Sequence, residues 1–316
     1  MINSKLIRVA LVAVLAAALA APTGFASALV TQVSLRQEQE QIADAKIHTA
    51  LKTALEDEEF VHILIKLREQ VDAFSVVQGA METLPERATP YNRKMAARYA
   101  VVAALRETAA STQGPTLKYL EAEMAQGQVK EINPYFIVNM IHAHANAGVI
   151  RELSLRPEVE TILPSNWIEL EQPLFLDSTD GPGKQWNLEQ IEAYAVWDAY
   201  GLDGTGVVVG IIDTGTHFEH EALKEKWRGY DPEGNHNPVF NWFDAVNGRA
   251  MPYDIDDVNY CHGTHVMGTI LGSHPESNNL IGVAPGARWI TAKAFIEEGG
   301  YDHWLLAAGE YMLAPT

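Results

Sequence analysis

The sequence predicts two segments of different fold class, an α+β segment followed by an α/β segment with a parallel sheet. Between residues 60 and 163 the apolar pattern runs strand, helix, helix, strand, helix, strand, which is typical of helices packed on an antiparallel sheet. After residue 186, continuous apolar strands alternate with helical stretches, as in a parallel sheet covered on both faces. The stretch 177–183 between them is polar and contains Gly and Pro, which indicates a linker.

The N-terminus predicts a secretory signal over residues 1–28. Lys5 and Arg8 supply positive charge, residues 9–20 form an uninterrupted apolar run, and Ala26-Ser27-Ala28 is a small-residue cleavage site. The apolar run is short for a membrane span, and the alternative that we weigh is an uncleaved anchor. We therefore expect a secreted, extracellular protein with no membrane partner after signal removal.

Residues 29–57 are predicted to be a leader helix and spacer, because residues 37–59 are polar, rich in Ala and Glu, and have a helical repeat of apolar residues. The α+β segment is predicted to cover residues 58–168. Asn146 is placed to cap its last helix, which ends before Pro157, and Gly114-Pro115 separates its first two helices. Its predicted elements are strands at 60–67, 136–143 and 158–163, and helices at 91–110, 116–126 and 147–155.

A linker with the processing region is predicted at residues 169–186, and the α/β segment at residues 187–316. This last segment has predicted strands at 207–212 and 289–294, a helix that begins at His262, and a helix over 301–313. With 316 residues the chain has room for roughly two domains, which agrees with this division.

Composition limits the classes of function. The content of 47% hydrophobic and 20% charged residues is that of a globular protein. A net charge of -18 argues against nucleic acid or anionic membranes as partners, and a solvated acidic surface explains it more simply than attraction to basic substrates. Cys261 is the single cysteine, so an intrachain disulfide is excluded. Although Cys261 lies beside His262, we interpret it as a small buried apolar residue rather than a nucleophile.

Two short motifs carry the chemistry. The run Val207–Ile212 ends in Asp213-Thr214-Gly215, and about fifty residues later His262-Gly263-Thr264-His265 opens an apolar helix. An aspartate at the end of a buried strand and a histidine at the start of a Gly-rich helix supply two members of an Asp, His, Ser triad in that order. A carboxylate at that end of a parallel strand also lies where α/β folds bind ligands.

These motifs, together with residues 186–191, 204–206 and 281–287, resemble those of the subtilisin-like serine proteases. The resemblance implies a subtilisin-like parallel-sheet domain in which Asp213 is the orienting acid and His262 the general base, with polypeptides as substrates. It implies that His265 is structural. It also implies that residues 58–168 are an inhibitor-type propeptide, which makes the protein's own propeptide a partner.

The third member of the triad is missing from the sequence. The only serines after His262 are Ser273 and Ser277, and neither lies in a Gly-Thr-Ser-x-Ala turn. We therefore expect this chain, taken alone, to be inactive. It resembles the first part of a longer catalytic domain.

Other kinds of site are less well supported. Asp-Thr-Gly also marks aspartic proteases, but these need two such loops, and only one occurs here. His262 and His265 could seat zinc, but no Glu follows the first His as in metalloprotease helices. No Gly-x-Gly-x-x-Gly leads into a helix from the glycines at 201–206, so we expect no dinucleotide.

Calcium is left open as a cofactor. Asp254, Asp256 and Asp257 could supply carboxylate oxygens, although an acidic loop over the substrate cleft is the simpler interpretation. By the same resemblance, Ala222 stands where many subtilisins carry a calcium-ligating aspartate, which argues against that family site.

The sequence thus predicts a secreted serine endopeptidase precursor, represented by its signal, propeptide and the first part of its catalytic domain. The alternative is a catalytically dead inhibitor or folding-assistant module whose working part is residues 58–168.

Overall fold

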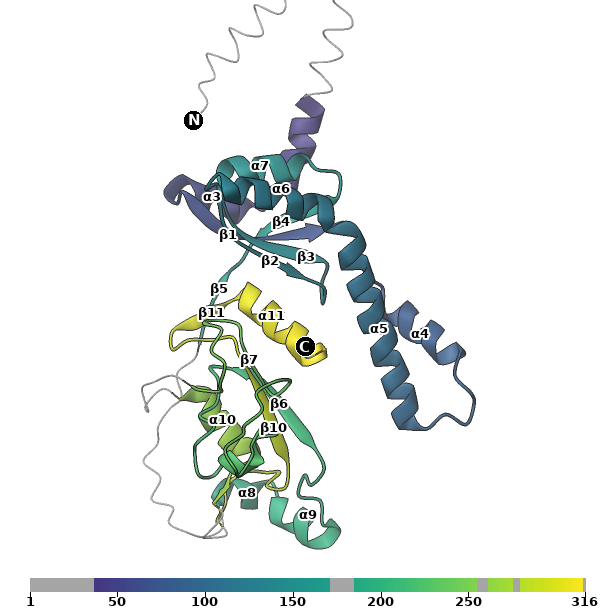
Figure 1. Cartoon of the computed structure of the whole chain (residues 1–316), viewed down its shortest axis with the longest axis vertical. Helices are drawn as coiled ribbons and strands as arrows, with labels where there is room; N and C mark the ends of the chain where they lie inside the picture. Colours follow the sequence, from purple (N-terminus) through teal and green to yellow (C-terminus); the bar gives the residue numbers. More distant parts are fainter. Residues whose placement is uncertain (1–36, 171–184, 255–260, 275–278, 315–316) are drawn as a thin grey trace, which may run out of the picture. The chain divides into compact units, whose positions relative to one another are not determined.

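A computed structural model describes residues 37–170, 185–254, 261–274 and 279–314 (Figure 1). The chain divides into two compact units. The first comprises residues up to Arg68 together with Lys118–Ile132 and Ala143–Pro164, and the second comprises Glu69–Leu117, Asn133–His142 and Ser165 onward. The predicted signal at 1–28 lies outside the described residues.

The first unit is built around an antiparallel pair in a four-stranded sheet of order β2-β3-β1-β4. Strand β1 (Phe60–Leu67) runs antiparallel to β4 (Val159–Pro164), with Ile63 opposite Pro164 and Leu67 opposite Val159. The other two strands are β2 (Val129–Tyr135) and β3 (Met140–Asn146). Helices α3 (Thr49–Asp57), α6 (Gly114–Ala125) and α7 (Ala147–Leu155) lie over one face of this sheet (Figure 1).

Several elements of this segment agree with the sequence pattern. Strand β1 has the predicted limits, and β4 and α7 differ from theirs by one residue or less. The side chain of Asn146 accepts a hydrogen bond from the backbone N–H of Val149, which is the predicted cap. The combination of helices with an antiparallel sheet confirms the α+β class.

Other predictions for this segment were wrong. Residues 136–139 form a turn rather than a strand, and the strand predicted at 136–143 begins only at Met140. Strand β2 and helix α4 (Ala73–Glu82) were not predicted. The leader is helical at 37–46 and again in α3, with a break where Ile47 bridges to Ile162. The helices predicted at 91–110 and 116–126 do form, as α5 (Pro90–Thr112) and α6, but Gly114 and Pro115 lie in the first turn of α6 rather than between the two helices.

The second unit contains the predicted parallel sheet, in the order β6-β10-β7. Strand β10 (Arg288–Lys293) pairs in parallel with β6 (Val208–Asp213) on one side and with β7 (Trp242–Asp244) on the other. The expectation of two covered faces holds for β10, which is buried from Trp289 to Lys293. It does not hold for the start of β6, where Val208 is 41% exposed.

Helices cover opposite faces of this sheet because its side chains alternate. Val209, Ile211 and Trp289 pack in one cluster with Met267 and Leu271 of α10 (His262–Leu271). Ile212 and Ala292 pack in a second cluster with Ala308 and Tyr311 of α11 (Asp302–Leu313). The two helices therefore fix the carboxyl end of β6 from both sides.

Smaller elements complete the second unit. Strand β5 (Trp167–Glu169) pairs antiparallel with β11 (Gly299–Tyr301), and β8 (Ser273–His274) pairs with β9 (Asn279–Leu280). Short helices α8 (Trp186–Gln190) and α9 (Ala193–Tyr200) precede β6, and a 3-10 turn, η1 (Lys224–Lys226), follows it. Among the described residues, no helix is both long and apolar enough to cross a bilayer.

Candidate active site

Asp213 is the last residue of β6, at the carboxyl edge of the parallel sheet. Its side chain is buried, and its Oδ1 accepts a hydrogen bond of 2.7 Å from the backbone N–H of Thr214. This bond turns the carboxylate toward the N-terminus of α10.

His262 is the first residue of α10, and its Nδ1 lies 2.7 Å from Oδ1 of Asp213. Because a carboxylate can only accept, Nδ1 carries the proton of this contact. Nε2 is then the basic nitrogen of the neutral ring. The structure therefore brings together the two residues that the sequence singles out, which are 49 positions apart.

Two glycines permit this approach. A Cβ on Gly263 would lie 2.1 Å from the carbonyl oxygen of Gly215 and 3.1 Å from Oδ1 of Asp213. Gly215 itself has φ +111°, and a Cβ there would lie 2.0 Å from the carbonyl oxygen of Tyr253. Side chains at either position would force the helix and the turn apart.

A buried cation lies behind the pair. Lys293, the last residue of β10, is 2% exposed and donates from Nζ to the carbonyl oxygen of Thr214 at 2.5 Å. Burial lowers the pKa of Lys293, and the charges of Asp254, Asp244 and Asp213 act in the opposite direction. The ammonium group of Lys293 therefore lies among the carboxylates of Asp254, Asp244 and Asp213.

Asp254 is one of the three aspartates for which calcium was left open. It is 3% exposed, and both its carboxylate oxygens accept hydrogen bonds from Thr214 and Thr264. These bonds leave it inside the protein rather than in an acidic surface loop. Asp256 and Asp257 lie outside the described residues.

A cavity of about 510 Å³ lies beside α10. Cys261 lines it and is half-buried, so it is not the fully buried apolar residue that the sequence suggests. His265 also lines it and is exposed, and Ala222 contributes a small apolar wall. The cavity wall is completed by His217, His220, Leu223, Thr264, Gly268, Thr269 and Ile281.

Of the two serines downstream of His262, Ser273 lies in β8, opposite Leu280. Ser277 lies outside the described residues. Neither the local pairing of Ser273 nor its sequence gives it the sharp turn that exposes a nucleophilic serine.

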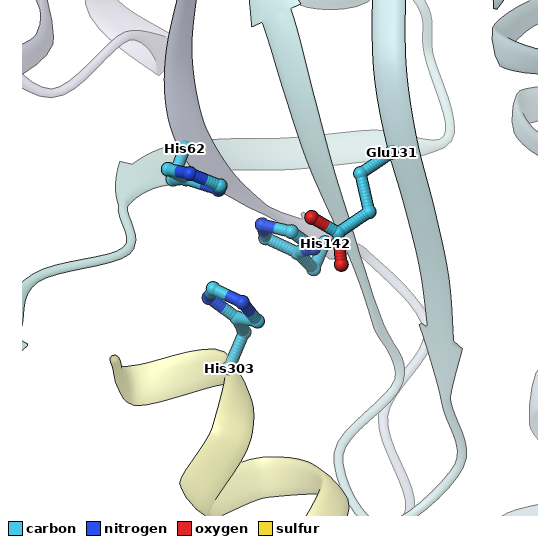
Figure 2. Close-up of side chains that lie close together, drawn as sticks. All are labelled: His62, Glu131, His142 and His303. Carbon is cyan, nitrogen blue, oxygen red and sulfur yellow. The ribbon is translucent and has the colours of Figure 1, made fainter. Parts of the chain in front are cut away.

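Histidines that the sequence analysis did not single out are shown in Figure 2. In the second unit, the rings of His142 and His303 stack with centroids 3.7 Å apart, and Nδ1 of His303 lies 2.9 Å from Oγ of Ser165. In the first unit, His62 stacks on His144 at 4.0 Å, and burial together with His144 lowers the pKa of His62. His142 and His144 lie two positions apart in β3. This spacing is the signal in the sequence that could have pointed to these histidines.

Among the described residues of either unit taken alone, no three His, Cys, Asp or Glu side chains have donor atoms within 4.8 Å of one another. His62 and Glu131 of Figure 2 belong to the first unit, and His142 and His303 belong to the second.

Comparison with known proteins supports the resemblance seen in the motifs. Residues 204–314 match the model of the subtilase family. Bacillopeptidase F of Bacillus subtilis is 40% identical over 309 residues, which cover 92% of this chain and 21% of that protein. A probable subtilase-type serine protease of Deinococcus radiodurans is 37% identical over 122 residues, which cover 37% of this chain and 16% of that protein.

The segment 204–314 therefore belongs to the subtilase family of serine proteases. Among solved structures, the epidermin leader peptide processing serine protease of Staphylococcus aureus aligns with a TM-score of 0.45 and 15% identity, over 78% of this chain and 46% of that one. The chain spans about a fifth of the length of bacillopeptidase F.

Proposed function

We propose that this chain is part of a secreted serine endopeptidase precursor in which Asp213 orients His262 and His262 acts as the general base. The observation that carries the proposal is the 2.7 Å contact between Nδ1 of His262 and Oδ1 of Asp213 within a subtilase-family segment.

The chemistry follows from the two nitrogens of His262. In subtilisins, which are a reference case for this triad, Nε2 takes the proton of a serine hydroxyl as its oxygen attacks the peptide carbonyl. The imidazolium is stabilised by the ionised Asp213, and Nε2 then gives the proton to the leaving amine. Water, activated by the same nitrogen, hydrolyses the acyl-enzyme and restores the serine.

The nucleophile in this proposal lies outside these 316 residues. Neither Ser273 nor Ser277 occurs in a Gly-Thr-Ser-x-Ala sequence. Within these residues Asp213 then orients the general base His262, but no serine hydroxyl is present for His262 to deprotonate. We therefore propose that it has no peptidase activity alone.

Residues 58–168 are proposed to be an inhibitor-type propeptide, with a signal at 1–28, a spacer at 29–57, a linker at 169–186 and the catalytic segment from 187. Contacts inside the second unit support a propeptide that binds the catalytic segment. Oε2 of Glu310 accepts from the backbone N–H groups of Phe136 and Ile137, at 2.6 and 3.1 Å. Oδ2 of Asp302 accepts from the backbone and side chain of Asn166, at 3.0 and 2.9 Å.

Strand β5 gives further support. Trp167–Glu169 adds to β11 as an antiparallel strand, and the next N–H, of Leu170, donates to the carbonyl oxygen of Glu298. Peptides bind proteins in this way when main-chain hydrogen bonds supply affinity. Main-chain hydrogen bonds place little requirement on the sequence of the bound peptide, which suits an endopeptidase. We therefore propose that substrates bind along the edge formed by β11.

The test compares His262→Ala with His265→Ala in folded, mature enzyme. We expect His262→Ala to lower kcat for a peptide ester by about 10⁴–10⁶, because the members of a triad act as a unit. His265→Ala, one helical turn away, should retain most activity. Hydrolysis at the normal rate by His262→Ala would contradict the proposed roles. If the 316-residue chain cleaved casein and Ser273→Ala abolished that cleavage, the proposal that the chain lacks its nucleophile would be wrong.

A further inference from the structure

Helix α10, which carries His262 as its first residue, has no cap of its own. The residue before it, Cys261, makes no side-chain hydrogen bond to the first turn. The first N–H groups of a helix need acceptors, and Ser, Thr, Asp or Asn at the cap position normally supply one. Here the acceptors come from two residues outside the helix and its cap position, one of them 49 positions away in the sequence.

Asp254 and Thr214 supply these acceptors. The N–H of Thr264 donates to Oδ2 of Asp254 at 2.8 Å, and the N–H of Gly263 donates to Oγ1 of Thr214 at 2.9 Å. The hydroxyl of Thr264 also donates to Oδ2 of Asp254. A carboxylate at this end of a helix is further stabilised by the helix dipole.

The same carboxylate is connected to the Asp213 end of the pair. The hydroxyl of Thr214 donates to Oδ1 of Asp254 at 2.6 Å, while the N–H of Thr214 donates to Oδ1 of Asp213 at 2.7 Å. Thr214 thus links the orienting acid, the first turn of α10 and Asp254. The N–H of Thr216 also donates to the carbonyl oxygen of Tyr253 at 3.1 Å, which holds the backbone next to Asp254 against the same turn.

We propose that Asp254 is a positioning residue for the His262–Asp213 pair. By capping α10 and holding Thr214, its carboxylate sets the separation of Nδ1 and Oδ1. The catalytic role of Asp254 rests on the proposed function. Its effect on the contact between Nδ1 of His262 and Oδ1 of Asp213 does not, because that contact can be measured without any enzymatic activity.

Removing the carboxylate should loosen the pair rather than unfold the unit. In Asp254→Asn one oxygen is replaced by an NH₂ group, which cannot accept, so the donors of either Thr264 or Thr214 lose their acceptor. Thr214→Val removes the other link, since it deletes the hydroxyl that joins Gly263 to Asp254.

The control is Asp244→Asn. Asp244 is also a buried carboxylate, 8% exposed, and it also contributes to the charge around Lys293. However, its oxygens accept from the N–H groups of its own loop, at Val246, Asn247 and Arg249. It therefore matches Asp254 in burial and charge, but the hydrogen bonds that these oxygens accept come from its own loop rather than from α10 or Thr214.

The experiment is ¹⁵N-edited NMR of the full 316-residue chain. A proton held in a short N–H···O⁻ bond is shifted to low field and exchanges slowly with water. We expect this signal from Nδ1 of His262 in the unaltered chain and in Asp244→Asn. In Asp254→Asn and Thr214→Val its exchange should be about ten-fold faster, which corresponds to the loss of one helix cap.

The outcomes separate the inference from the proposed function. An unchanged signal in both Asp254→Asn and Thr214→Val would overturn the positioning role and leave the proposed function intact. A missing signal in the unaltered chain would instead show that the His262–Asp213 contact does not form, and the proposed function would lose its main support. If Asp254→Asn does not fold, as judged by its thermal transition against Asp244→Asn, the Thr214→Val result decides the question.

Discussion

At the scale of single residues, Gly263 shows how an absent side chain determines the site. We predict that Gly263→Ala lowers the free energy of unfolding by about 1–3 kcal/mol, since the new methyl group would overlap the carbonyl oxygen of Gly215 at 2.1 Å. Urea titration of the chain measures this change.

Gly268, in the same helix, provides the matched control. A Cβ at Gly268 meets no atom within 4 Å, so Gly268→Ala should raise stability by about 0.5–1 kcal/mol through helix propensity alone. Equal effects of the two substitutions would show that close approach of α10 to β6 is not the reason for glycine at 263.

The two residues of the candidate pair could be predicted from the sequence, whereas the residues around them could not. Asp213 and His262 lie in short motifs, each at a strand or helix end that hydrophobic patterning reveals. Asp254 and Lys293 have no such local signal. Their roles depend on contacts with Thr214 across 40 and 79 positions, which only the folded chain creates.

At the scale of elements, patterning worked where one face is buried and failed where it is not. Strand β1 is buried at Val61, over Ile63–Ile65 and at Leu67, and this apolar run was predicted with its limits. Strand β2 has the sequence Val-Lys-Glu-Ile-Asn-Pro-Tyr, with buried side chains only at its two ends, and gives no repeat to recognise. Helix α4 has no buried residue and packs against α5, and the local signal for its start is the side chain of Asp72, which accepts from the N–H groups of Phe74 and Ser75.

Helix α11 carries a pH-dependent contact at Glu310. Burial raises the pKa of Glu310, while the N–H groups of Ile137 and Phe136 and the charge of Arg106 act against this rise. A carboxyl whose pKa is raised on folding favours the folded state most when it is protonated. Its contribution is therefore complete below the ordinary glutamate pKa of about 4.3 and is lost as the pH rises through the raised value.

We therefore predict that the stability difference between Glu310→Gln and the unaltered chain changes with pH. The variant, which cannot ionise, should gain relative stability as the pH rises from about 4.3 towards neutrality. Urea unfolding at several pH values measures this difference, and Glu107→Gln, at an exposed position on α5, controls for the loss of one surface charge. A difference that does not vary with pH would contradict the prediction.

At the scale of the whole molecule, the order of two fold classes along one chain was predictable because each class has its own hydrophobic pattern. The α+β segment and the parallel sheet both form as expected, with an antiparallel pair in the first unit and β6-β10-β7 in the second. The compact units are less predictable from the sequence. Residues 69–117 group with the second unit, although they precede β2, β3 and β4 in the sequence. Contacts made by α5 and the 133–142 turn, such as that of Arg98 with the carbonyl oxygen of Leu313, produce this grouping.

The maturation of the precursor gives the last prediction. The sequence changes from α+β to α/β patterning across a polar junction that contains Gly and Pro, the kind of segment that proteases cut. We expect N-terminal sequencing of the secreted product to place its first residue between Pro164 and Trp186. Cleavage there leaves β6, α10 and α11 on the mature side and β1 to β4 on the other. In a secreted precursor that carries His262→Ala, the same cut should be absent if the protease processes itself. A mature terminus at Ile137, within the segment that Glu310 holds, would contradict the boundary, because it would leave β3 and β4 attached to the enzyme.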